Sequence, residues 1–120
     1  MKRISSVLIL TLILQNCTLL SLANRNEDIA GVEIVNIEEI QNAEGESIRE
    51  IRGVVPAPFD TDEEWIFAFR TIHTQKKIPG QNTVIKIFLE EDNWELGTPY
   101  GVAKYYQTKQ STIRVDGRRL

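Results

Sequence analysis

From Gly31 to the end of the chain, short segments of alternating polarity are separated by turn residues about every ten residues. Alternation indicates strands with one buried face, because successive side chains of a strand point to opposite sides of a sheet. A chain of 120 residues is long enough for a single domain. We therefore predict a mostly β fold, a small antiparallel sandwich or barrel of six to seven short strands, over residues 31–120.

The first two of these segments are expected to form a hairpin. Aliphatic residues alternate with acids from Gly31 onward, and the alternation is broken near Asn36. A polar turn over 41–47 leads to a returning strand over 48–55. That strand is expected to end at the Pro-Ala-Pro sequence that follows, because proline cannot donate a hydrogen bond to a sheet.

Residues 59–74 are compatible with two structures. Thr61 and Glu64 have the spacing of a capping box, in which each side chain bonds the backbone of the other at the start of a helix. One stripe of that helix would carry Trp65, Phe69, Ile72 and Lys76. Aromatic and β-branched residues dominate the segment, however, and these types favour strands. We favour a buried strand here and keep an α+β fold with a helix near 61–77 as the alternative.

The second half of the chain contains further strand patterns after a turn centred on Pro79-Gly80. The most regular alternation contains Ile85, Ile87 and Leu89 on one side. The expected strands cover residues 83–90, 94–96, 100–107 and 113–115, of which the second is a short edge piece. Asp116-Gly117 is typical of a turn after the last of them.

The N-terminus has the pattern of a secretory signal. Lys2 and Arg3 precede an uncharged, mainly apolar run over 4–14, which matches the positive and apolar regions of a signal peptide. Cleavage after Ala23 is one possible outcome, because small residues occupy the positions that signal peptidases read. An uncleaved anchor over 4–23 is another, although it would place two polar amide side chains in the bilayer.

A third outcome involves the single cysteine, which follows the apolar run. The sequence Leu14-Gln15-Asn16-Cys17 resembles the lipobox of bacterial lipoprotein precursors, in which a leucine stands three positions before an obligatory cysteine. Only these four residues carry the resemblance, and Asn16 departs from the usual small residue. The resemblance implies a signal over 1–16 (1–23 in the alternative), a lipid on Cys17 that holds the chain on a membrane, and a tether over 17–30.

Charge and residue types argue against several functions. The chain has a net charge of −3, and residues 27–64 contain twelve acids against two arginines, so nucleic acid is not an expected partner. His73 is the single histidine, and no serine or cysteine nucleophile is apparent for a catalytic triad. We therefore expect no enzymatic activity, no catalytic residue and no cofactor.

Two acidic loops and one aromatic stretch are the candidate sites. Calcium binds several carboxylate and carbonyl oxygens, which two acidic loops at one end of a sandwich could supply. The predicted calcium ligands are Asp60, Asp62, Glu64 and Asp92. Exposed aromatic side chains often anchor protein or glycan partners, although core packing is their commoner role. The predicted binding residues are Trp94, Tyr100, Tyr105 and Tyr106.

The sequence therefore predicts a small exported lipoprotein of the bacterial cell envelope with a non-enzymatic binding or structural role. Its expected partners are a membrane, through the lipid on Cys17, and a protein or cell-wall component. One alternative is a soluble periplasmic or secreted binder or inhibitor cleaved after Ala23. A second alternative is a calcium-binding β-sandwich.

Overall fold

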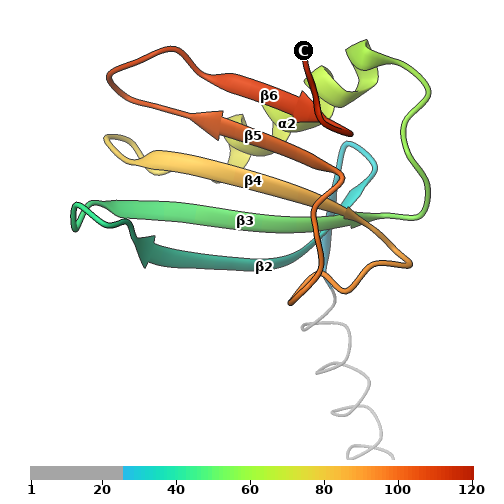
Figure 1. The fold of residues 1–120 in the computed structure, drawn as a ribbon, viewed down its shortest axis with the longest axis horizontal. Helices are drawn as coiled ribbons and strands as arrows, with labels where there is room; N and C mark the ends of the chain where they lie inside the picture. Colours follow the sequence, from blue (N-terminus) through green and yellow to red (C-terminus); the bar gives the residue numbers. More distant parts are fainter. Residues whose placement is uncertain (1–25) are drawn as a thin grey trace, which may run out of the picture.

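The structure, a computed structural model, describes residues 26–120, which form one seven-stranded sheet with a helix on one face (Figure 1). The strands lie side by side in the order in which they occur in the chain. They are β1 (Glu27–Ile29), β2 (Val32–Gln41), β3 (Ser47–Val55), β4 (Asn82–Leu89), β5 (Gly101–Tyr105), β6 (Thr112–Val115) and β7 (Arg118–Arg119). The predicted mostly β class with six to seven strands is confirmed. The predicted signal and Cys17 lie outside the described residues.

Neighbouring strands are antiparallel except for β3 and β4, which are parallel. Parallel neighbours need a crossover connection, usually a helix, and here α2 (Asp62–Lys76) provides it. The strand order is linear from β1 to β7, so the sheet is open and the barrel alternative is wrong. The expectation that all strands pair antiparallel is also wrong at this one junction.

The predicted first hairpin is confirmed as β2 and β3. Their register shifts between Ile34 and Asn36, where the alternation of the sequence is broken. The sheet also begins earlier than predicted, because β1 falls in the expected tether and pairs with β2. The turn between these two strands uses positive φ angles at Ala30 and Gly31, of which only Gly31 adopts this conformation without steric cost.

The strand that we favoured within 59–74 is wrong, and the alternative helix is the observed structure. The side chain of Thr61 accepts a hydrogen bond from the backbone of Glu64, whose side chain bonds the backbone of Thr61 in return. Burial then follows the helical period: Trp65, Ala68, Phe69 and Ile72 are buried, whereas Phe67 is 64% exposed. The capping box and this stripe outweigh the β propensity of individual residues, because tertiary burial overrides propensity.

The hydrophobic core lies between α2 and the sheet. It contains Ile51 and Val55 of β3, Ile85 and Ile87 of β4, Ala103 of β5, and the buried helix residues. Gly101 allows the helix aromatics to approach β5 closely. A Cβ atom at this position would lie 3.0 Å from Cζ of Phe69 and 3.2 Å from Cζ3 of Trp65, so a larger residue would crowd both rings.

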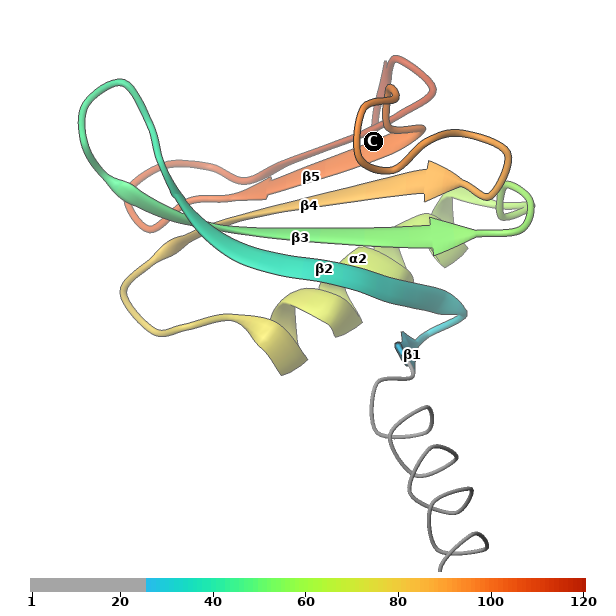
Figure 2. The same ribbon diagram turned by 90° about the horizontal axis from the view of Figure 1, so that it is seen from below.

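No helix of residues 26–120 covers the opposite face of the sheet. Instead, the connection between β4 and β5 folds back over it, so that this loop and α2 lie on opposite sides of the sheet (Figure 2). The expected edge strand at 94–96 is wrong, because these residues form a turn within this connection. We call the face that carries this loop the open face.

Candidate functional site

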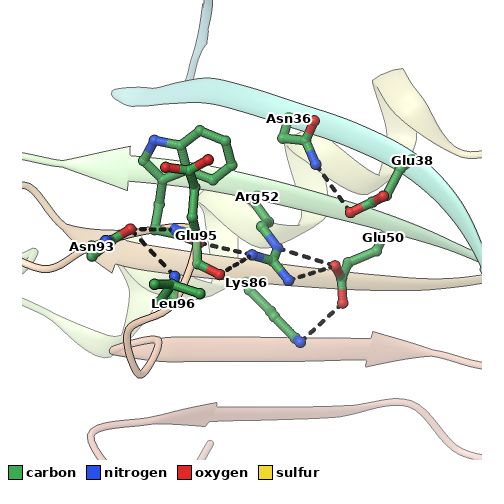
Figure 3. A network of polar contacts seen from close by, with 9 residues as sticks. Asn36, Glu38, Glu50, Arg52, Lys86, Asn93, Glu95 and Leu96 are labelled. Atoms are coloured by element: carbon green, nitrogen blue, oxygen red, sulfur yellow. Dashed lines mark hydrogen bonds and ion pairs between the residues drawn. The ribbon is translucent and has the colours of Figure 1, made fainter.

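A polar network on the open face centres on one buried carboxylate (Figure 3). Glu50 and Arg52 are two residues apart in β3 and therefore point to the same face, and Lys86 lies opposite Arg52 in the parallel register with β4. Glu50 is only 4% exposed. Its two carboxylate oxygens lie 3.0 Å from Nη2 of Arg52 and 2.9 Å from Nζ of Lys86.

The two cations compensate for the burial of the Glu50 carboxylate. Burial alone would raise its pKa, because an apolar environment disfavours the charged form. The hydrogen bonds and charges of Lys86 and Arg52 outweigh that effect, so that the pKa of Glu50 lies below its ordinary value. The carboxylate is thus ionised at neutral pH and holds both cations in fixed positions.

Arg52 also fixes the loop that crosses the open face. Its Nη1 donates to the backbone carbonyl of Trp94 at 2.8 Å and to that of Glu95 at 3.2 Å. Within the loop, the side chain of Asn93 accepts hydrogen bonds from the backbone of Glu95 at 2.8 Å and of Leu96 at 3.3 Å. We call residues 93–96, held in this way, the braced turn.

The braced turn exposes a large aliphatic side chain. Leu96 is 87% exposed, more than the two other large apolar side chains that are exposed in residues 26–120, Phe67 and Ile78. The backbone that carries this side chain is fixed by the hydrogen bond that Arg52 donates to the carbonyl of Trp94 and by the one that the backbone N–H of Leu96 donates to Asn93. A rigid backbone reduces the conformational entropy that a contact residue loses on binding. A side chain held in this way is well placed to insert into an apolar pocket.

The four predicted aromatic binding residues do not form one surface. Trp94 is half-buried in the braced turn. Tyr100 comes directly before β5 and Tyr105 is its last residue. Both pack against α2: Tyr100 stacks on Trp65, and Tyr105 on His73. Tyr106 has the ammonium group of Lys109 at 4.4 Å from its ring centre.

The stacked pair of His73 and Tyr105 is partly buried, with ring centres 3.9 Å apart. Burial lowers the pKa of His73, and the charge of Lys77 adds to this effect. Burial also raises the pKa of Tyr105. Both side chains are therefore uncharged at neutral pH, and they act as packing between the helix and the sheet.

The four predicted calcium ligands are separated in the structure. Asp62 pairs with Arg118 at 3.1 Å, and Glu64 belongs to the capping box of α2. Asp60 and Asp92 are exposed on different loops. Within the part of the chain that the structure describes, no group of three or more acidic, histidine or cysteine side chains is placed to share a metal ion.

Of the residues in this site, only Trp94 was among those predicted from the sequence. The spacing of Glu50 and Arg52 indicates that they share a face, which was a usable signal. The position of Lys86 beside them was not readable, because it depends on the parallel register of β3 and β4. The exposure of Leu96 was hidden by the expectation of an edge strand, in which an aliphatic side chain is normally half-buried.

Comparisons of the chain with protein-family models, with curated proteins and with solved structures found no match. Among the described residues, α2 is too short and too polar to cross a membrane, and no other helix qualifies.

Proposed function

We propose that this protein is a non-enzymatic binding module of the bacterial cell envelope that recognises another protein through the braced turn. The observation that carries the proposal is the exposure of Leu96 on a backbone fixed by Arg52 and Asn93. Protein interfaces draw most of their affinity from a few side chains that enter desolvated pockets of the partner. The partner is therefore expected to offer an apolar pocket for Leu96.

The attachment proposed from the sequence is a lipid on Cys17. Glu27, the first residue of β1, comes ten positions after Cys17, and a chain of that length spans at most about 35 Å. A lipid on Cys17 would thus keep the domain within this distance of the membrane. Confinement of this kind raises the effective concentration of the domain toward a partner in the same membrane.

Replacing Cys17 tests the attachment. In the Cys17→Ala variant we expect the chain to leave the membrane fraction, because stable anchoring depends on the acyl chains. The measurement is the distribution of the full chain between membrane and soluble fractions, together with the intact mass of the wild-type protein. If Cys17→Ala remains with the membranes, or if the wild-type mass fits an unmodified chain from Asn24, the lipid anchor is wrong.

Replacing Leu96 tests the binding surface. With a photo-cross-linking amino acid at position 95, we expect Leu96→Ser to lower the yield of cross-linked partner in cells by about tenfold or more, as for a central anchor of an interface. Phe67→Ser is the matched control, because Phe67 is also exposed but lies on the helix side. Equal yields in wild type and Leu96→Ser would show that Leu96 is not the anchor.

A further inference from the structure

A separate hollow of about 380 Å³ lies beside β5 and β6. Val102 and Lys104 of β5 and Thr112 and Arg114 of β6 contribute to its wall, and Tyr100 lies at its edge. Arg114 is the register partner of Val102, and Thr112 is that of Lys104, so the two cations lie diagonally across the strand pair. No aspartate or glutamate of the described residues lines this hollow.

The polar side chains of this hollow have no partners within the described part of the chain. Lys104 and Arg114 take part in none of its ion pairs. The hydroxyl groups of Thr98, Tyr100 and Thr112 also make no hydrogen bond to another described residue. The hollow thus combines two cations that take part in no ion pair of the described residues with three hydroxyl-bearing residues in its wall.

A second hollow, at the end of the sheet where the β2–β3 turn lies, is a useful contrast. It is larger, at about 570 Å³, and it is also lined by polar residues. Its side chains bond one another, however: the amide of Gln81 donates to Glu39 and to Ser47, and that of Gln107 donates to the backbone carbonyl of Gln81. These bonds account for the amide nitrogens of Gln81 and Gln107 as part of the fold, although Oε1 of Gln81 is buried without a partner among the described residues. The hollow at β5 and β6 has no such bonds between its side chains.

We propose that the hollow at β5 and β6 binds a phosphate monoester. A phosphate monoester carries a charge of about −1.5 to −2 at neutral pH and three acceptor oxygens. That charge matches the two cations, and the oxygens can accept from the guanidinium of Arg114, the ammonium of Lys104 and the hydroxyl groups. A carboxylate carries a single negative charge and one oxygen fewer, so it would compensate the two cations less completely. Val102 and the ring of Tyr100 supply apolar surface for the rest of the ligand.

The hollow shares no residue with the braced turn or with the lipid anchor, so its test does not depend on the outcome of theirs. The full-length chain is placed in phosphatidylcholine nanodiscs and titrated with inorganic phosphate at constant ionic strength, while amide chemical shifts are recorded. We expect saturable shifts at the backbone of 102–104 and 112–114. Acetate at the same concentrations is expected to give no saturable shift there.

Two double variants provide the comparison. Lys104→Gln with Arg114→Gln removes both cations and is expected to weaken phosphate binding by about tenfold or more. Arg70→Gln with Lys77→Gln changes the net charge equally at exposed positions outside the hollow and is expected to leave binding unchanged. Both variants should retain wild-type spectra elsewhere, because all four side chains are exposed.

Adding phosphatidic acid to the nanodiscs distinguishes two sources of the phosphate. If the same amides shift without free phosphate, the site accepts a lipid phosphate headgroup. If they shift with inorganic phosphate but not with phosphatidic acid, the site accepts the phosphate group of a soluble ligand. Either result supports the site. The proposal is overturned if neither addition shifts these amides, if acetate is equivalent to phosphate, or if Lys104→Gln with Arg114→Gln binds as the wild type does.

Discussion

Phe69→Ala is expected to lower the free energy of unfolding by about 3–5 kcal/mol, the usual loss for a large aromatic side chain deleted from a core. Phe69 is fully buried between α2 and the sheet, where it approaches Gly101. Phe67→Ala is the matched control, because the same atoms are removed from an exposed side chain. It is expected to change the free energy of unfolding by less than about 0.5 kcal/mol. Denaturant unfolding of both variants measures the difference.

This pair of variants also distinguishes the helical structure of 62–76 from the strand that was favoured for this segment from the sequence. Residues two apart in a strand point to the same face of a sheet, so a strand would place Phe67 and Phe69 in similar surroundings. In a helix, the same two residues lie about 200° apart around the axis. Similar losses of stability for Phe67→Ala and Phe69→Ala would therefore contradict the helical structure of 62–76.

Glu50→Ala is expected to have the second largest effect, a loss of about 2–3 kcal/mol in the free energy of unfolding. Removing one partner of a fully buried ion pair typically costs about 3–5 kcal/mol, because an uncompensated charge remains. The side chains of Arg52 and Lys86 are 20% and 30% exposed, so water can partly solvate them and reduce the loss. Denaturant unfolding measures it. In addition, amide hydrogen exchange of the braced turn should become faster, because Glu50 no longer positions Arg52.

Glu38→Gln is the control for this variant, because Glu38 is exposed and bonds only the side chain of Asn36 among the described residues. It is expected to leave both stability and exchange close to those of the wild type. If Glu50→Ala and Glu38→Gln unfold at the same denaturant concentration, the network contributes nothing to stability.

The contribution of Glu50 should depend on pH in one direction. Its pKa in the folded protein lies below the ordinary value of 4.5, so the folded state favours the ionised form. The resulting stabilisation is fully present above pH 4.5 and is lost as the pH falls through the lower pKa of the folded state. The difference in melting temperature between wild type and Glu50→Gln is therefore expected to shrink on acidification below pH 4.5. A difference that grows on acidification would show that the pKa is raised instead.

Much of the sheet could be predicted from the sequence because its signals are local. Alternating polarity marked β2, β3 and β4, the break near Asn36 marked the irregular register, and Pro56 ended β3. The start of α2 was also visible, in the spacing of Thr61 and Glu64. For residues 65–72 two local patterns predicted different structures. The β propensity of the side chains favoured a strand, whereas the spacing of the apolar residues favoured a helix, and burial against the sheet determines that the segment is helical.

The candidate site depends on contacts that no local pattern contains. Arg52 reaches the carbonyl groups of Trp94 and Glu95, more than forty residues away in the chain. Lys86 joins Glu50 only because α2 returns the chain to run parallel to β3. The aromatic residues were chosen by type, and type alone does not distinguish a ring packed against a helix from one exposed to a partner.

The linear order of the strands has a consequence for how the domain assembles. Each strand pairs with its neighbours in the chain, so nearly all pairings close short loops, which lose little chain entropy. The exception is the pairing of β3 with β4, which closes the loop that contains α2. Once that loop closes, β5, β6 and β7 can each add to an edge that is already formed. The pairing of β3 with β4 is therefore expected to be the slowest step in forming the sheet, because it is the parallel pairing with the longest loop.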